Sequence, residues 1–169
     1  MKIRRETPSD YNEVYELVKI SFTATGESDG EWDYLNDLRK KDTFIPELSL
    51  IAEDDDGKIT GQIVLYEMTI KGPKRDFTEL LLSPVCVHPD YFGKGIARAM
   101  IEKSFDIAKE MGYKVVFLCG KPELYRRFGF KPTFEYNIFL VKDDSAEWCM
   151  CLELVKDALK GISGTIDII

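Results

Sequence analysis

The segment Val87–Arg98, with the sequence VHPDYFGKGIAR, places two glycines around a lysine. An apolar run, TELLLSPVCV, comes before it, and apolar side chains recur at helical spacing over residues 94–111 after it. Glycine lets the backbone approach a ligand closely, and the N-terminus of a helix attracts anions. A Gly-x-Gly at such a junction therefore predicts a phosphate close to the backbone.

Two common phosphate signatures do not fit this segment. A Walker A loop needs the pattern GxxxxGK[ST], which the sequence does not contain. A dinucleotide fingerprint, GxGxxG, needs a small residue where Arg98 stands, and it belongs to the first strand–helix unit of a parallel sheet. Here the glycines come past the middle of the chain, after the hairpin turn DDDG at 54–57. Neither signature explains the glycines.

The rest of the chain predicts a single domain over residues 1–169, built as a mixed α/β sheet. The expected elements, in chain order, are a strand at 2–5, a helix after Thr7 and Pro8, a helix at 30–41, strands at 48–53, 58–68 and 78–87, a helix at 94–111, a strand at 114–119, a short helix at 123–128, and strands near 136–142 and 147–154. Proline has no N–H for a strand ladder, so we expect Pro84 to interrupt its strand at an edge or a bulge.

Charge and composition exclude several classes of partner. Acidic residues exceed basic ones by 30 − 23 = 7, which disfavours nucleic acid and favours a cationic small molecule or a lysine-bearing peptide. No apolar run reaches the roughly 20 residues of a membrane span, and the first residues do not resemble a secretion signal. We therefore expect a cytoplasmic protein with no membrane partner.

The four cysteines, Cys86, Cys119, Cys149 and Cys151, lie in apolar, strand-like runs. In a cytoplasmic protein they are expected to be reduced thiols of the core. Cys149 and Cys151 share one strand face, but the single histidine, His88, is far away in the sequence. Because a metal site needs more ligands than these, no metal is expected.

The glycine segment resembles the acyl-CoA loop of the GNAT superfamily of N-acetyltransferases. In that family a strand ending in Val-x-Pro leads into Gln/Arg-x-x-Gly-x-Gly/Ala and a long helix. Val87–Ala97 matches this order, with Phe92 at the Gln/Arg position. A second segment, LYRRFGFKP at 124–132, resembles the family's second cofactor segment, and one strand, KVVFLC, separates the two. The resemblance covers residues 1–142 in element order and identifies the chain as a small stand-alone member.

This resemblance implies a mostly antiparallel mixed sheet with flanking helices and a splayed central pair of strands. It also implies direct acetyl transfer from acetyl-CoA, as co-substrate, to a primary amine of a small molecule or peptide, in a monomer or homodimer. The residues that it assigns to the cofactor are Val85, Cys86, Val87, Phe92, Gly93, Lys94, Gly95, Ile96, Ala97, Arg98 and Tyr125.

Two side chains are candidates for proton transfer. By the resemblance, Tyr125 protonates the leaving thiolate, and Glu79 takes the proton of the attacking amine. Each has a structural alternative: Tyr125 as a half-buried aromatic residue and Glu79 as a surface charge. The amide of Val87 is the candidate for polarising the thioester. Core-like cysteines disfavour a covalent route through a thiol.

Several other residues stay open at this point. The carboxylates of Glu27, Asp29 and Glu31 would line the acceptor side or would be solvated. Lys94 would reach a phosphate or point into solvent, and His88 is expected to pack or to cap a turn rather than to catalyse.

Two other classes of protein also stay open. A CoA-binding module would keep the fold and sense acyl-CoA without turnover. An unrelated α/β protein would use the Gly-x-Gly as a simple turn into a helix. Acetyl-CoA binding excludes the unrelated protein, and thiol release in the presence of an amine distinguishes an enzyme from a sensor.

Overall fold

The computed structural model describes residues 1–26 and 30–168, and the chain divides into two compact units. Unit 1 comprises Met1–Tyr66 and Ser83–Ala108, and unit 2 comprises Glu67–Leu82 and Lys109–Ile169. Strand β3 (Ile59–Lys71) begins in unit 1 and ends in unit 2, whereas β4 (Asp76–Val87) begins in unit 2 and ends in unit 1.

Unit 1 is built on antiparallel strands in the order β1-β2-β3-β4. β1 (Lys2–Arg5) pairs with β2 (Phe44–Glu53), and β2 pairs with β3. The predicted hairpin turn joins β2 to β3. In it the Asp54 carboxylate accepts backbone N–H groups of Asp56 and Lys58, both at 2.9 Å, and Gly57 has a positive φ of 80°.

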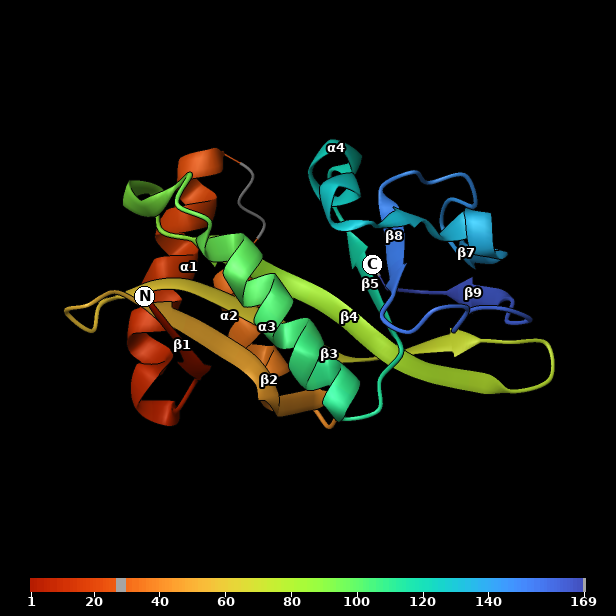
Figure 1. Ribbon diagram of the computed structural model, residues 1–169, viewed down its shortest axis with the longest axis horizontal. Helices are drawn as coiled ribbons and strands as arrows, with labels where there is room; N and C mark the ends of the chain where they lie inside the picture. The colour runs from red at the N-terminus through yellow and green to blue at the C-terminus, as the bar shows by residue number, and fades with distance from the viewer. Residues whose placement is uncertain (27–29, 169) are drawn as a thin grey trace. The chain divides into compact units, whose positions relative to one another are not determined.

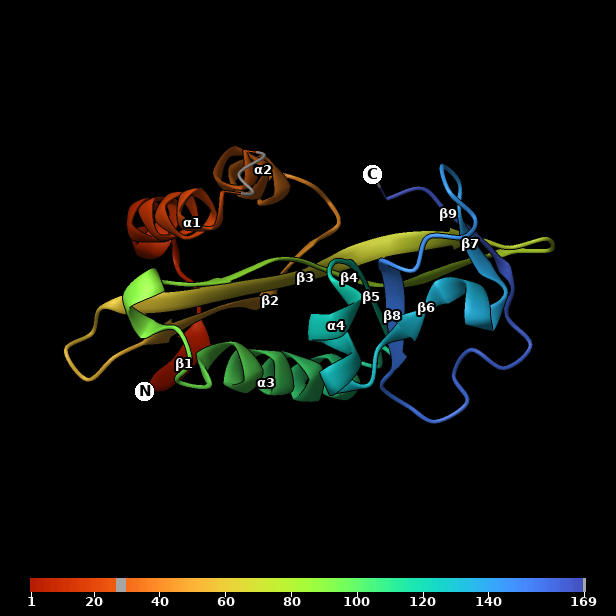
Figure 2. The same cartoon turned by 90° about the horizontal axis from the view of Figure 1, so that it is seen from above.

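Helices cover both faces of this sheet (Figure 2). α1 (Tyr11–Thr25) and α2 (Glu31–Leu38) lie on one face, and α3 (Ile96–Glu110) lies on the other. Apolar residues of α1 and α2 are buried together in a core cluster that includes Val14, Leu17, Val18, Leu35 and Leu38. This packing supports the end of β4 from the α1 side, because Cys86 belongs to the same cluster.

Unit 2 has the strand order β4-β5-β8-β6, of which β4, β5 and β8 are labelled with α4 in Figure 1 and β6 is labelled in Figure 2. β5 (Val115–Cys119) runs parallel to β4 and antiparallel to β8 (Cys149–Glu153), which pairs with β6 (Lys131–Pro132). β7 (Ile138–Leu140) runs parallel to β9 (Gly164–Ile166), and β9 pairs with β3. α4 (Pro122–Tyr125) and a 3₁₀ turn (Arg126–Phe128) follow β5. The predicted mixed, mostly antiparallel sheet with flanking helices is confirmed.

Several predicted boundaries are corrected. The strand expected at 48–53 begins at Phe44, and the helix expected from residue 94 begins at Ile96, because the left-handed Gly95 still belongs to the preceding turn. The strand expected near 136–142 is a 3₁₀ turn (Thr133–Tyr136) followed by the short β7. β6 and β9 were not predicted, since strands of two or three residues hold too few positions for an alternating pattern.

Two predictions about single residues are wrong. β4 continues through Pro84 to Val87, with a cis Ser83–Pro84 peptide bond, so the expected interruption is wrong, whereas the expected edge position agrees with the pairing of β4 with β5 at Leu80 and Leu81, before the proline. A strand tolerates proline where no ladder partner needs its missing N–H. Cys119 is exposed, although Cys86, Cys149 and Cys151 are buried as predicted. Cys119 is the last residue of β5, where the apolar cover of the strand ends.

No helix within residues 1–26 and 30–168 combines the length and apolar character needed to cross a membrane.

Candidate functional site

The loop between β4 and α3 presents its backbone openly. Gly93 and Gly95 have φ angles of 76° and 77°, in the left-handed region that favours glycine. Apart from each glycine and its two chain neighbours, no atom of residues 1–26 and 30–168 lies within 4 Å of the position that a Cβ would take at either glycine. The glycines are therefore needed for the backbone conformation, and the space beside them is open to a ligand.

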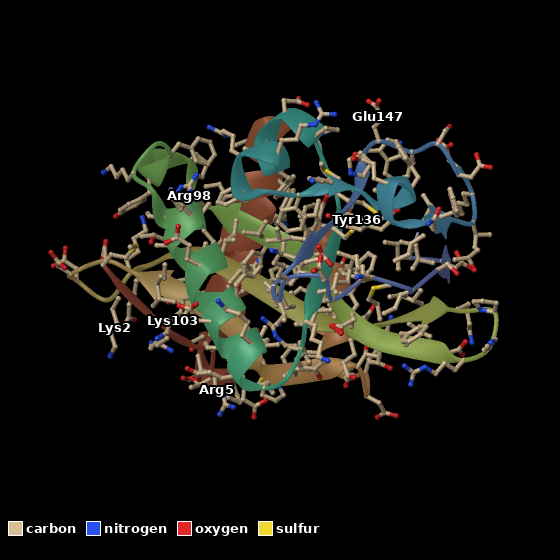
Figure 3. The ribbon with its side chains drawn as sticks, turned by 45° about the vertical axis from the view of Figure 1, so that its right-hand side comes forward. Lys2, Arg5, Arg98, Lys103, Tyr136 and Glu147 are labelled. Atoms are coloured by element: carbon tan, nitrogen blue, oxygen red, sulfur yellow. The ribbon has the colours of Figure 1, made fainter. Side chains whose placement is uncertain are left out.

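The start of α3 presents backbone N–H groups at a helix N-terminus. The first helical hydrogen bond of α3 runs from the N–H of Ala99 to the carbonyl of Gly95, at 3.1 Å. The N–H groups of residues 96–98 therefore precede the helical ladder and lie at the positive end of the helix dipole. Arg98 and Lys103 extend from this helix (Figure 3), and Arg98 lies 3.6 Å from the Glu102 carboxylate. This arrangement suits an anion such as a pyrophosphate.

Phe92 has a hydrogen-bonded backbone amide and an exposed side chain. Its backbone N–H is bonded to the carbonyl of Pro89 at 3.3 Å, and its side chain is 54 % exposed. Of the predicted cofactor-binding residues in this loop, Phe92 therefore has a backbone N–H that is already hydrogen-bonded within the protein.

Tyr91 fastens the loop to the β2–β3 hairpin. Its hydroxyl donates to the Asp54 carboxylate at 2.8 Å, which raises the pKa of Tyr91 and lowers the pKa of Asp54. The ammonium groups of Lys58 and Lys94 lie 5.5 and 5.0 Å from the centre of the Tyr91 ring. The Lys94 ammonium therefore lies beside the Tyr91 ring, within the loop. Neither Tyr91 nor Asp54 was predicted, because the two lie 37 positions apart and carry no shared motif.

His88 caps the turn that precedes the glycines. Its Nδ1 accepts the backbone N–H of Asp90 at 3.1 Å, at the start of the 3₁₀ turn Pro89–Tyr91. This confirms the expectation that His88 caps a turn.

The register of β4 decides which of its backbone groups are available. The N–H of His88 donates to the carbonyl of Thr60 on β3 at 2.7 Å. Successive residues of an antiparallel strand face alternate sides, so Cys86 also turns its backbone toward β3, whereas Val85 and Val87 turn away from it. The Val87 carbonyl accepts the Ser21 hydroxyl at 3.0 Å. Of the three predicted cofactor-binding residues of β4, this geometry favours Val85 and Val87 over Cys86.

The Cys86 thiol is an unsuitable nucleophile. Burial raises its pKa to about 11, so the thiol is protonated near neutral pH. The amide of Gln62 donates to its sulfur at 3.7 Å. The negative charge of Glu31, in the first turn of α2, raises the pKa of Cys86 further. Glu27 and Asp29, the other two carboxylates predicted for the acceptor side, lie outside the described residues.

Tyr125 lies in unit 2, at the end of α4. A Cβ added to Gly120 would stand 2.5 Å from Cε2 of the Tyr125 ring, so the ring packs directly on the Gly120 backbone. The Phe130 ring meets it edge-on at 6.0 Å. Burial raises the pKa of Tyr125, which keeps its hydroxyl protonated near neutral pH.

Glu79, also in unit 2, anchors the start of β5. Its Oε2 accepts the backbone N–H groups of Lys114 and Val115, both at 3.0 Å. Burial raises the pKa of Glu79, and these two hydrogen bonds act in the opposite direction. Tyr125 follows the other end of β5, and the strand rises about 3.3 Å per residue. This placement favours a structural role for Glu79 over the predicted role of a base.

Among residues 1–26 and 30–168, no group of three or more His, Cys, Asp or Glu side chains could hold a metal ion.

Comparison with known proteins identifies the family. Residues 2–133 match the family described as Acetyltransferase (GNAT) domain. The chain belongs to the GNAT family of acetyltransferases. It is 32% identical over 167 residues to the uncharacterised N-acetyltransferase YhbS of Escherichia coli K12, covering 99% of this chain and 95% of YhbS. The prediction of an acyltransferase enzyme is thereby confirmed.

Solved structures of GNAT proteins agree with this assignment. The crystal structure of Escherichia coli YhbS in complex with CoA matches with a TM-score of 0.87 at 29% identity, over 99% of this chain and 89% of that one. A GNAT acetyltransferase from Brucella melitensis in complex with acetyl-CoA matches with a TM-score of 0.77 at 26% identity, over 99% and 95% of the two chains.

Proposed function

We propose that this GNAT protein transfers an acetyl group from acetyl-CoA directly to a primary amine of a small molecule or peptide. The observation that carries the proposal is the loop of unit 1, in which Gly93 and Gly95 leave the backbone open just before the first N–H groups of α3. These donors fit the pyrophosphate of CoA. The complexes of YhbS with CoA and of the Brucella melitensis protein with acetyl-CoA support the same ligand.

Other residues of the chain bind the pantetheine arm, stabilise the thioester oxygen and donate a proton to the leaving thiolate. The backbone groups of Val85 that turn away from β3 hydrogen-bond the pantetheine arm, and the Val87 N–H stabilises the charge that develops on the thioester oxygen. Acetyl-CoA supplies the activated acetyl group when it is bound. Tyr125 donates the proton that the departing thiolate takes up, and its raised pKa keeps that proton in place. Direct attack by the amine is supported by the protonated, buried Cys86 thiol.

The acceptor in this proposal is a cationic amine. The net charge of −7 attracts cations, and Glu31 adds a carboxylate whose charge acts on Cys86 at the end of β4. We also propose that residues 1–169 act as one domain, monomeric or homodimeric. A cytoplasmic location is proposed because all four cysteines are free thiols.

Calorimetric titration with acetyl-CoA, CoA and ATP tests the ligand. We expect binding of acetyl-CoA and CoA and none of ATP, and failure to bind acetyl-CoA would contradict the proposal. A screen of amines and lysine peptides for release of free CoA thiol then tests the reaction. Binding of acetyl-CoA without turnover of any amine would favour a sensor over an enzyme.

A further inference from the structure

Cys119 and Cys149 stand opposite each other on the antiparallel strands β5 and β8 of unit 2. Beyond them, the N–H of Gly120 donates to the carbonyl of Trp148 at 2.9 Å. Hydrogen-bonded and non-hydrogen-bonded pairs alternate along an antiparallel ladder, so the two cysteines form a non-hydrogen-bonded pair. The Cα atoms of such a pair are about 4.5 Å apart, which is within the range that a disulfide spans.

The two thiols also interact directly. A hydrogen bond between them raises the pKa of Cys119 and lowers the pKa of Cys149. The Thr133 hydroxyl donates a second hydrogen bond to the Cys149 sulfur, at 3.8 Å. The sulfur atoms therefore face each other, and Cys149 has two donors that stabilise its thiolate.

Exposure differs sharply between the two members of this pair. Cys119 is exposed, whereas Cys149 is fully buried. An oxidant in solution therefore reaches Cys119 first and leaves Cys149 as the neighbouring thiol. Cys151, on the same face of β8, is buried opposite Phe117 and so has no cysteine across the ladder. An accessible thiol beside a second thiol is the arrangement found in cysteine pairs that close to disulfides.

We propose that Cys119 and Cys149 form an oxidisable dithiol that closes to a disulfide when the protein meets a peroxide. The Cys119 sulfur attacks one oxygen of hydrogen peroxide, the O–O bond breaks, and the thiol proton passes to the departing hydroxide, so that a sulfenic acid and water result. The Cys149 sulfur then attacks the Cys119 sulfur, and the departing hydroxide leaves as water with the Cys149 proton. In total two thiols lose two hydrogens and two electrons, and one peroxide becomes two waters.

The disulfide would form next to Gly120, the residue on which the Tyr125 ring packs. Gly120 directly follows Cys119, and the Tyr125 ring packs on the Gly120 backbone. The disulfide would therefore link the C-terminal end of β5, next to the Tyr125 ring, covalently to β8.

Peptide mapping after peroxide treatment tests the proposal. The reduced wild-type chain is treated with excess hydrogen peroxide, its remaining thiols are alkylated, and the digest is analysed by mass spectrometry. We expect a loss of about 2 Da, a peptide pair linked through Cys119 and Cys149, and reversal by dithiothreitol. Cys119→Ser and Cys149→Ser should each abolish the link. The matched variant Cys151→Ser should retain it.

Several results would overturn this assignment. They are an unchanged mass, a link that involves Cys86 or Cys151, oxidation of Cys119 that stops at a sulfinic or sulfonic acid, and disulfide-linked dimers in place of an internal bond. The decisive measurement uses the wild-type chain, so a variant that fails to fold does not affect it.

Discussion

The Tyr125 ring is held in place by close packing against the Gly120 backbone and the Phe130 ring. The ring contacts Gly120 so closely that no side chain larger than hydrogen fits there, and it meets Phe130 edge-on. Removing the hydroxyl should therefore leave the ring in place. This separates the chemical role of Tyr125 from its structural one.

We expect Tyr125→Phe to lower kcat by about 10²-fold or more while the Kd for acetyl-CoA stays within about twofold, because only the proton donor is lost. Steady-state kinetics and calorimetry measure the two constants. Tyr136→Phe is the matched control, since Tyr136 lies in the same unit and its pKa is also raised by burial. A large loss of acetyl-CoA binding in Tyr125→Phe would show that Tyr125 holds the cofactor instead.

Glu79→Gln tests whether Glu79 is a base or an anchor. Glutamine keeps an acceptor for the N–H groups of Lys114 and Val115, so we expect kcat to fall by less than about tenfold, whereas loss of a general base costs about 10²-fold or more. The raised pKa of Glu79 means that its protonated form favours folding at low pH, and this contribution is lost as pH rises through the folded pKa. Near neutral pH the variant should therefore be at least as stable as the wild type. A kcat reduced a hundredfold in a stably folded variant would restore Glu79 as the base.

At the scale of elements, the β4–α3 loop and the β2–β3 hairpin contain glycines in the same backbone state. Gly95 and Gly57 have φ angles of 77° and 80°, and both have open space where a Cβ would stand. They differ in position, because Gly95 precedes the first amides of α3 and Gly57 does not precede a helix. The two glycines therefore allow conformational strain to be separated from ligand binding.

We expect Gly95→Ala and Gly57→Ala each to lower the free energy of unfolding by about 1 kcal/mol, the cost of a left-handed alanine. Only Gly95→Ala should also weaken acetyl-CoA binding, by about tenfold, which corresponds to 1.4 kcal/mol. Chemical denaturation and calorimetry measure the two effects. Equal weakening by both variants would argue against the loop as the phosphate site.

The junction between β1 and α1 depends on a charged contact. The Arg4 guanidinium makes two hydrogen bonds to the Asp10 carboxylate, at 2.8 and 2.9 Å, and the Thr7 N–H adds a third at 2.8 Å. The hydrogen bonds from Arg4 are the main cause that lowers the pKa of Asp10 from 3.8 to about 2. Asp10 is buried, whereas 29% of the Arg4 side chain is exposed, so water screens this contact in part.

A lowered pKa stabilises the folded state above the unfolded pKa, and the contribution disappears as pH falls through the folded pKa. We therefore expect Asp10→Asn to lose about 2 kcal/mol of unfolding free energy near neutral pH. The difference from wild type should shrink between about pH 4 and pH 2. Denaturation curves across this range measure it, with Asp55→Asn as control because the Asp55 side chain is 99% exposed. A difference that does not change with pH would contradict this account.

At the scale of the molecule, the chain divides into two units that share β3 and β4. Because two continuous strands belong to both units, neither unit can unfold without disturbing the other. We expect calorimetry to show one cooperative unfolding transition, shifted upward by acetyl-CoA because the ligand binds only the folded chain. Two separate transitions, with only one of them shifted by the ligand, would show that the units are independent domains.

The sequence predicted best those features that depend on neighbouring residues. The DDDG turn, the helix after Thr7 and Pro8 and the cap by His88 all follow from local chemistry, and all three were found. It predicted least well where the number of residues was small, as in β6 and β9. The hydrogen bond between Tyr91 and Asp54 could not be predicted from the sequence, because a contact between distant segments produces no periodic pattern of residues.

By itself the sequence determined the family, the mixed sheet and the place of the glycine loop, because turn residues and helix starts act over a few positions. Only the tertiary structure decided that Val85 and Val87 turn away from β3, that Glu79 anchors β5, and that Cys119 faces Cys149. Each of these depends on strand register. Register is set by the packing of segments far apart in the chain, and a shift of one residue would turn every side chain to the other face.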